Sequence, residues 1–222
     1  CIRWDVQAFI TTHSAEAIDA ILQQKDVLAV MPTGAGKSIC YQIPALMLPG
    51  ITLVISPLIS LMQDQVENLR QSGIPAACLN SSMSFEEYQQ VLSGAAAGMF
   101  RLIYVAPERL TTEAFLRFAA HSTISMITVD EAHCVSQWGQ DFRPSYLEIA
   151  QQLPQRPILT AFTATATEQV KRDIIQLLGL QDPVAISTGY NRSNLYFAVQ
   201  RPQNKKKALL DLMRKFSKKS GI

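Results

Sequence analysis

Short runs of β-branched and aliphatic residues alternate with segments of helical period along most of this chain. The apolar runs predict strands at Asp26–Met31, Ile51–Ile55, Ala76–Asn80, Arg101–Val105, Ile124–Val129 and Pro157–Phe162. The segments between them predict helices at Ser14–Gln24, Lys37–Met47, Pro57–Gln71, Ser84–Ala97, Pro107–Ala119 and Thr167–Leu178. Apolar strands separated by helices are typical of a parallel sheet with both faces covered. The chain is therefore expected to be an α/β protein with a mostly parallel sheet and helices on both faces.

The start and end of the third predicted helix carry specific signals. Ser56 is expected to cap this helix, because serine accepts hydrogen bonds from the first free N–H groups of a helix. Pro57 follows in the first turn, where its missing N–H costs nothing. The glycine at Gly73 is expected to end the helix.

Length and composition favour one globular domain. The chain has 222 residues, of which 48% are hydrophobic and 17% charged, so it is not expected to be disordered. The four cysteines include no Cys-x-x-Cys pair, so reduced thiols are expected and a zinc cluster is not. The longest apolar runs are of strand length and no secretory signal is visible. These features predict a soluble, cytosolic protein with no membrane partner.

Basic residues are concentrated at the end of the chain. From Arg201 onward there are eight lysines and arginines and a single acid, Asp211. Residues 205–219 have the pattern of a basic amphipathic helix. The predicted organisation is one domain over residues 1–200, followed by residues 201–222 with this helix. Charge alone leaves open whether the helix contacts nucleic acid or only solvent.

The strongest local motif lies between the first predicted strand and the helix that follows it. The sequence Met31-Pro32-Thr33-Gly34-Ala35-Gly36-Lys37-Ser38 has the glycines, lysine and hydroxyl of a phosphate-binding loop. Backbone N–H groups from Thr33 to Ser38 would bind the phosphates, and Lys37 would neutralise their charge. Ser38 would provide a ligand to Mg²⁺. The alternative reading is a glycine-rich turn that happens to precede a lysine.

Two adjacent acids follow the strand predicted at Ile124–Val129. Asp130 comes directly after this strand, at the edge where the phosphate loop is also expected, so its carboxylate could reach a shared Mg²⁺. Glu131 could then accept a proton from the water that attacks the γ-phosphate. A surface turn is the alternative reading. Together with the loop, the pair predicts nucleotide hydrolysis with Lys37, Asp130 and Glu131 as catalytic residues.

Several further motifs resemble those of the RecQ family of superfamily 2 DNA helicases. They are Ser56-Pro57-Leu58-Ile59-Ser60-Leu61-Met62-Gln63-Asp64-Gln65, Tyr104-Val105-Ala106-Pro107-Glu108-Arg109-Leu110, Asp130-Glu131-Ala132-His133, Trp138-Gly139-Gln140-Asp141-Phe142-Arg143-Pro144 and Phe162-Thr163-Ala164-Thr165-Ala166. Their order matches the family's first motor lobe from about Asp19 to Leu180. The resemblance implies a RecA-like P-loop NTPase lobe that uses ATP and Mg²⁺ and moves 3′ to 5′ on single-stranded DNA in repair and recombination.

DNA contacts are expected from aromatic and strand-end residues. Trp138 and Phe142 fall in an irregular loop beside Arg143, where they could stack on unpaired bases while the arginine holds a phosphate. Ser56 and Arg109 would lie at other strand ends on the same edge of the sheet. The partners expected are therefore single-stranded or duplex DNA. The alternative is that the aromatic residues fold back onto the core.

The resemblance also implies a second motor lobe. In the family this lobe supplies arginines to the γ-phosphate, and the chain is expected to stop where its first strand would begin. The 222 residues alone are therefore expected to hydrolyse ATP slowly and to unwind nothing.

Two positions depart from the family pattern. Gln140 stands where the family has a histidine, and Thr11 and Ser14 stand where the family has an arginine and the glutamine that reads adenine. The departures leave open a non-catalytic lobe that binds DNA or a partner. An RNA helicase lobe is a further alternative, which the run Trp138–Pro144 disfavours.

Overall fold

The computed structural model describes residues 11–137, 156–188, 198–199 and 201–216. The chain divides into two compact units, Cys1–Gly189 and Tyr190–Ile222. The first unit contains the sheet and the candidate site. In the second unit, the helix α9 (Lys205–Lys215) begins after Asn204, whose side chain accepts a hydrogen bond from the N–H of Lys207 at 3.0 Å.

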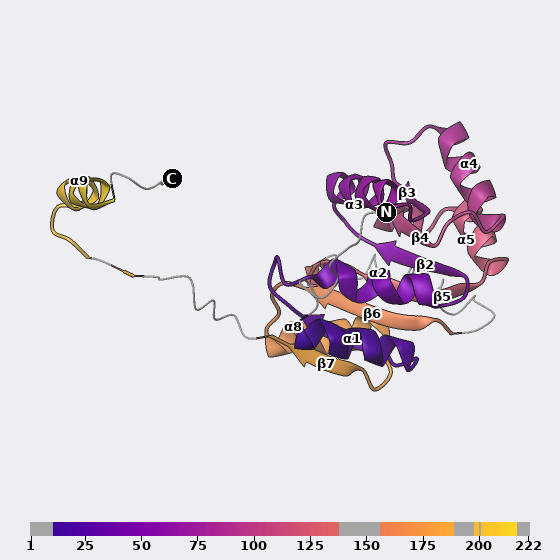
Figure 1. The fold of residues 1–222 in the computed structure, drawn as a ribbon, viewed down its shortest axis with the longest axis horizontal. Coiled ribbons are helices and arrows are strands. Elements are labelled where there is room, and N and C mark those ends of the chain that lie inside the picture. Colours follow the sequence, from indigo (N-terminus) through magenta and orange to yellow (C-terminus); the bar gives the residue numbers. More distant parts are fainter. Residues whose placement is uncertain (1–10, 138–155, 189–197, 200, 217–222) are drawn as a thin grey trace. The chain divides into compact units, whose positions relative to one another are not determined.

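A seven-stranded sheet forms the centre of the first unit (Figure 1). Its strands are β1 (Val27–Val30), β2 (Ile51–Ile55), β3 (Ala76–Leu79), β4 (Leu102–Val105), β5 (Ile124–Val129), β6 (Ile158–Thr163) and β7 (Val184–Ser187). The spatial order is β3-β4-β2-β5-β6-β1-β7, and every neighbouring pair is parallel. All strands therefore end at one edge of the sheet. The predicted α/β class with a parallel sheet is confirmed.

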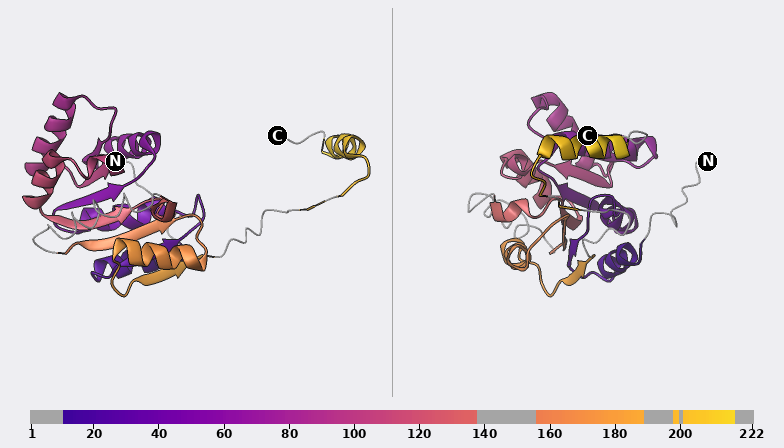
Figure 2. Two further views of the ribbon diagram at one scale, coloured as in Figure 1. Left: turned by 180° about the vertical axis from the view of Figure 1, so that it is seen from behind. Right: turned by 90° about the vertical axis from the view of Figure 1, so that its left-hand side faces the viewer.

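Helices cover both faces of this sheet, as the two further views show (Figure 2). Apolar residues of α1 (Thr12–Leu22), α2 (Lys37–Met47) and α3 (Ile59–Gln71) share one core cluster with strand residues. The other cluster includes residues of α4 (Phe85–Ala96), α5 (Glu113–Ala120) and α8 (Glu168–Leu178). The strands β1 to β6 are almost wholly buried because both faces are covered, whereas β7, at the edge of the sheet, is not. Among the described residues, no helix has the length and apolar character that a membrane span requires.

Three details differ from the sequence-based expectations. The third helix begins at Ile59 after Leu58, and Ser56 does not cap it. The single helix expected over Pro107–Ala119 is a short 3₁₀ helix, η2 (Pro107–Arg109), followed by α5. The short elements α6 (Cys134–Gln137) and β7 were not predicted. Ser56 fails as a cap because it still belongs to the strand layer: its N–H donates to the carbonyl of Val105 at 3.2 Å and its side chain is buried.

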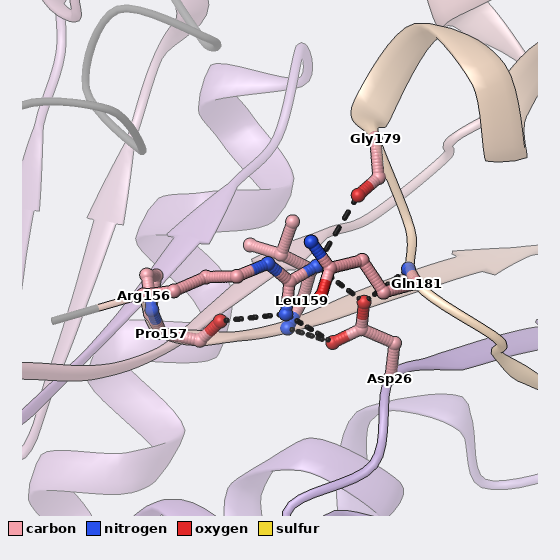
Figure 3. A network of polar contacts seen from close by, with 6 residues as sticks. All are labelled: Asp26, Arg156, Pro157, Leu159, Gly179 and Gln181. Carbon is pink, nitrogen blue, oxygen red and sulfur yellow. Dashed lines mark hydrogen bonds and ion pairs between the residues drawn. The ribbon is translucent and has the colours of Figure 1, made fainter.

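An ion pair at the start of β1 joins three segments far apart in sequence (Figure 3). The carboxylate of Asp26 is almost completely buried and lies 2.6 Å from the guanidinium of Arg156. It also accepts backbone hydrogen bonds from Leu159 at 3.0 Å and Gln181 at 2.7 Å. Arg156 in turn donates to the carbonyl of Gly179 at 3.2 Å. One carboxylate thus holds the beginnings of β1 and β6 and the segment leading into β7.

Candidate nucleotide-binding site

The predicted phosphate loop connects the end of β1 to the start of α2. Gly34 and Gly36 have φ angles of 84° and 80°, in the left-handed region that glycine adopts without steric cost. Gly36 is the N-cap of α2, so the helix N-terminus opens directly onto the loop. The ammonium of Lys37 donates to the carbonyl of Met31 at 3.2 Å. The strand, loop and helix order required for phosphate binding is therefore present.

The acidic pair follows β5 at the same edge of the sheet. Strand β6 lies between β5 and β1, and all three run parallel, so their ends are neighbours. The N–H of Asp130 donates to the carbonyl of Ile55 at 2.9 Å, and the N–H of Ala132 donates to Phe162 at 2.9 Å. These bonds fix the turn after β5 against the ends of β2 and β6.

The electrostatic state of Asp130 links this residue to the phosphate loop. Burial and the negative charge of Glu131 raise the pKa of Asp130 to about 6, whereas the N–H of Glu131 and the charges of Lys37 and His133 act in the opposite direction. Its side chain accepts the N–H of Glu131 at 3.0 Å, and within the described residues it forms no ion pair. The site therefore combines a nearly buried carboxylate with the nearby Lys37, on the same side of the sheet.

Glu131 is held by its backbone and by His133. Its φ of 49° lies in the left-handed region, which is uncommon for a residue with a side chain and often found at functional sites. Nδ1 of His133 lies 3.3 Å from a carboxylate oxygen of Glu131 and 2.9 Å from the hydroxyl of Thr163. His133 therefore connects the acidic turn after β5 with the end of β6.

The groups at this edge fit a magnesium nucleotide. Magnesium prefers oxygen ligands and is usually bound through one or two carboxylates and the substrate phosphates. Ser38 and Asp130 provide a hydroxyl and a carboxylate, and the repulsion between Asp130 and Glu131 would be relieved by a divalent cation. The space beside Gly34 is open, since a Cβ built there would meet nothing within 4 Å. Backbone N–H groups from Thr33 to Ser38 could therefore approach phosphate oxygens.

The predicted DNA contacts divide into two groups. Arg109 is partly buried: its Nε donates to the carbonyl of Asn80 at 2.9 Å, and its guanidinium lies 4.8 Å from the ring centre of Tyr88. Ser56 is buried, and within the described residues its hydroxyl has no hydrogen-bond partner. Both follow strands at the same edge as the phosphate loop.

The other predicted DNA contacts belong to the aromatic loop. Trp138, Phe142 and Arg143, together with Gln140, lie outside the described residues. Their roles remain predictions.

Two features were not found from the sequence. The bridging position of His133 depends on a contact between residues 30 apart, which no local pattern encodes. Tyr41 is fully buried in α2: burial raises the pKa of its hydroxyl well above the ordinary value, and Tyr104, Asp130 and Ser38 also act on it. The residues that depart from the family's adenine motif have a structural role. The hydroxyl of Thr11 accepts the N–H of Ser14 at 3.2 Å and caps α1.

Fold and site together define a RecA-like lobe of the P-loop class. The chain belongs to the DEAD/DEAH box helicase family, whose model matches residues 11–173. It is 44% identical over 211 residues to the ATP-dependent DNA helicase RecQ of Bacillus subtilis, covering 93% of this chain and 36% of that protein. It is 48% identical over 187 residues to the RecQ helicase of Pasteurella multocida, covering 83% of this chain and 29% of that protein.

The chain thus spans about a third of the length of these relatives. Among solved structures, a hypothetical ATP-dependent RNA helicase from Sulfolobus tokodaii has the same fold, with a TM-score of 0.64 and 22% sequence identity. The alignment covers 80% of this chain and 52% of that one. The expected RecA-like fold and the RecQ resemblance are confirmed.

Proposed function

We propose that this chain is the nucleotide-binding motor lobe of a RecQ-type, ATP-dependent DNA helicase that moves 3′ to 5′ on single-stranded DNA. The observation that carries the proposal is the common edge of β1, β5 and β6, where the phosphate loop and the pair Asp130 and Glu131 lie together. The identity to RecQ helicases over most of the chain supports DNA as the partner.

The residues of the candidate site would have distinct roles in ATP hydrolysis. Bound Mg²⁺ would neutralise phosphate charge and orient the triphosphate. Ser38 and Asp130 would hold the cation, and Lys37 would exchange its bond to Met31 for a phosphate oxygen. Glu131 would orient the attacking water and accept its proton, with His133 restraining its carboxylate.

The DNA interface and the second lobe complete the proposal. Ser56, Arg109, Trp138, Phe142 and Arg143 are the candidate DNA contacts. Residues 1–200 would form the lobe, and residues 201–222 would begin a second one. The protein would work in the bacterial cytoplasm and nucleoid, or in a nucleus. Because a second lobe supplies the arginine finger, worth roughly 10³–10⁵ in rate in comparable enzymes, we expect slow ATP turnover by these 222 residues.

Substitutions at two positions separate binding from chemistry. Lys37→Ala should weaken binding of Mg²⁺–ATP by about tenfold or more, because a charge-assisted contact is lost. Glu131→Gln should bind ATP normally and lose about 10²–10⁴ of its turnover, because a general base is lost. Calorimetry and phosphate release measure the two effects. Lys171→Ala, which removes a lysine of a surface ion pair on α8, is the control and should change neither.

Equal ATP binding by the parent and Lys37→Ala would contradict the motor and favour a non-catalytic lobe.

In competition binding to this chain, single-stranded DNA should displace a labelled DNA strand better than RNA of the same sequence does. The reverse order would favour an RNA helicase.

A further inference from the structure

The side chain of Arg109, in the short helix η2 after β4, is held by groups from two other parts of the chain. Its Nε donates to the carbonyl of Asn80, the residue after β3, at 2.9 Å. Its guanidinium lies 4.8 Å from the ring centre of Tyr88 on α4. A free arginine side chain samples many rotamers. Contacts on two different elements therefore fix the position and the plane of this guanidinium.

The carbonyl that accepts from Arg109 is itself fixed. Asn80 is fully buried, and its Oδ1 accepts hydrogen bonds from the N–H of Ser82 at 2.9 Å and from the Ser82 hydroxyl at 2.6 Å. An asparagine that bonds to the backbone two residues ahead forms a tight local turn. The carbonyl of Asn80 therefore holds Nε of Arg109 in one place.

The ring of Tyr88 is anchored by two hydrogen bonds that lead back to Arg109. Its hydroxyl lies 2.8 Å from Oγ1 of Thr112, and the Thr112 hydroxyl donates to the carbonyl of Arg109 at 2.9 Å. Because threonine has a single hydroxyl hydrogen, Tyr88 is the donor of the first bond. Thr112 is the N-cap residue of α5 but makes no capping bond with its side chain. Its hydroxyl thus joins Tyr88 to Arg109 instead of capping the helix.

The charged end of Arg109 is left available by these contacts. In the part of the chain that the structure describes, its two terminal nitrogens have no hydrogen-bond partner and no carboxylate pairs with it. A guanidinium stacked on a ring keeps its edge open, and two terminal nitrogens can bind two oxygens of one phosphate. Arg109 also follows β4 at the edge of the sheet where the phosphate loop lies. An external anion can therefore supply the missing negative charge.

We propose that Tyr88 is a positioning residue for DNA binding, whose ring holds the guanidinium of Arg109 in the orientation that receives a phosphate of the single strand. Ordering a long side chain on binding lowers affinity, and an arginine that is already ordered avoids this loss. The aromatic ring stacks on the guanidinium without neutralising its charge. This inference rests on the proposed function, because it requires Arg109 to contact DNA.

Tyr88 is also a core residue, so loss of its ring should lower stability whatever its role. The side chain is 4% exposed and belongs to the apolar cluster that includes residues of α4 and α5. A tyrosine that only fills the core affects DNA binding independently of Arg109. A positioning residue acts through Arg109, so its effect disappears when the arginine is absent.

The test is a double-mutant cycle in the 222-residue chain, measured as the affinity for a fluorescently labelled oligo-dT strand. Tyr88→Leu and Tyr88→Met each remove the ring and keep a large apolar side chain that favours a helix. Either should weaken binding about three- to tenfold, because Arg109 must then be ordered on binding. Arg109→Ala should weaken binding about tenfold or more, because a charged contact is lost. In the Arg109→Ala background, loss of the ring should have no further effect.

Phe115→Leu is the matched control, because Phe115 is a fully buried aromatic residue of the same cluster and is not among the described contacts of Arg109. It should lower the midpoint of thermal unfolding, as the Tyr88 variants do, and keep the parent's affinity for the strand. The Tyr88 variants should also keep the parent's affinity for Mg²⁺–ATP.

The outcomes separate the inference from the proposed function. If the parent does not bind the strand, or if Arg109→Ala binds it as tightly as the parent, the proposed DNA contact fails and the inference fails with it. If Arg109→Ala weakens binding but the Tyr88 variants do not, or if their effect is the same in both backgrounds, the contact stands and only the inference is wrong. If neither Tyr88 variant folds, or if Phe115→Leu loses as much DNA affinity as they do, the ring is structural and the inference is wrong.

Discussion

The environment of Asp130 suits a carboxylate that binds a cation better than it suits an uncompensated negative charge. Its carboxylate is mostly buried and stands next to a second acid, and both factors disfavour its charged form. Such a group binds a proton more tightly in the folded protein than in the unfolded chain. The folded state accordingly loses stability as the pH rises from about 4, the usual pKa of aspartate, through the raised pKa of about 6.

Asp130→Asn should therefore stabilise the nucleotide-free protein. At pH 8 we expect a gain of about 1–3 kcal/mol, since a pKa difference of one unit corresponds to roughly 1.4 kcal/mol. The asparagine oxygen can still accept the N–H of Glu131. Urea unfolding in EDTA measures the gain, which should shrink toward pH 4, where the aspartate is protonated in both states.

Asp64→Asn is the control for this change, because Asp64 is exposed on α3. It should alter the unfolding free energy little at either pH. A constant difference between Asp130→Asn and the parent from pH 4 to pH 8 would show that the carboxylate's charge is not the cause.

At the scale of single residues, the sequence could predict the position in the fold of residues that is set by their neighbours in the chain, while their roles remain predictions. Lys37 and Ser38 follow the glycines directly, and Asp130 follows a strand directly. The contacts of His133 could not be predicted, because they join residues that are brought together only by folding. The DNA contacts at Trp138, Phe142 and Arg143 remain predictions.

Most helices and strands could be predicted because their patterns are strong. β2, β5 and α2 have the predicted bounds, and most other elements differ by one or two residues. The strand β7 was missed because it lies at the edge of the sheet: only Ile186 is buried in it, so it lacks the apolar run of a central strand. α3 begins later than predicted because Ser56, the residue after β2, still donates a hydrogen bond to β4.

The start of β2 depends on a glycine. Gly50 has a φ of 77°, and a Cβ there would lie 2.3 Å from the carbonyl oxygen of Thr123, which accepts the N–H of Ile51. Gly50→Ala should therefore cost about 2–4 kcal/mol of stability, from left-handed backbone strain together with the disturbed hydrogen bond. Chemical denaturation measures the loss.

Gly73→Ala separates these two causes. Gly73 has a similar φ of 76°, but a Cβ there would meet nothing within 4 Å. Its cost should be only the backbone strain, about 1–2 kcal/mol. Equal losses at the two glycines would mean that the contact with Thr123 has no effect.

In the whole lobe, the candidate binding groups and the buried ion pair of Asp26 and Arg156 lie at opposite ends of the strands. The raised pKa of Asp130, the strained φ of Glu131 and the buried hydroxyl of Ser56, which has no hydrogen-bond partner among the described residues, belong to the edge where the strands end. The satisfied ion pair of Asp26 and Arg156 lies where β1 begins, separated from the phosphate loop by four strand residues at about 3.3 Å each.

Asp26→Asn should thus reduce stability without changing nucleotide affinity. We expect a loss of about 2–4 kcal/mol, less than for a fully buried pair because Arg156 is partly exposed. Glu113→Gln, in an exposed pair with Arg117, is the control and should cost less than about 0.5 kcal/mol. Calorimetric titration with ATP, at a temperature where the variant is folded, measures the affinity. A fall in ATP affinity together with the loss of stability would contradict this separation.

The pairing of β1 has a consequence for biosynthesis. Val27 lies opposite Thr160 of β6 and Val184 of β7, so β1 is hydrogen-bonded to the two strands of this sheet that come last in the sequence. A nascent chain that stops before β6 would contain the complete phosphate-loop sequence but no neighbouring strand to hold it. The phosphate-loop sequence is therefore synthesised well before β6 and β7, so β1 gains the strands that pair with it only late in the synthesis of this sheet.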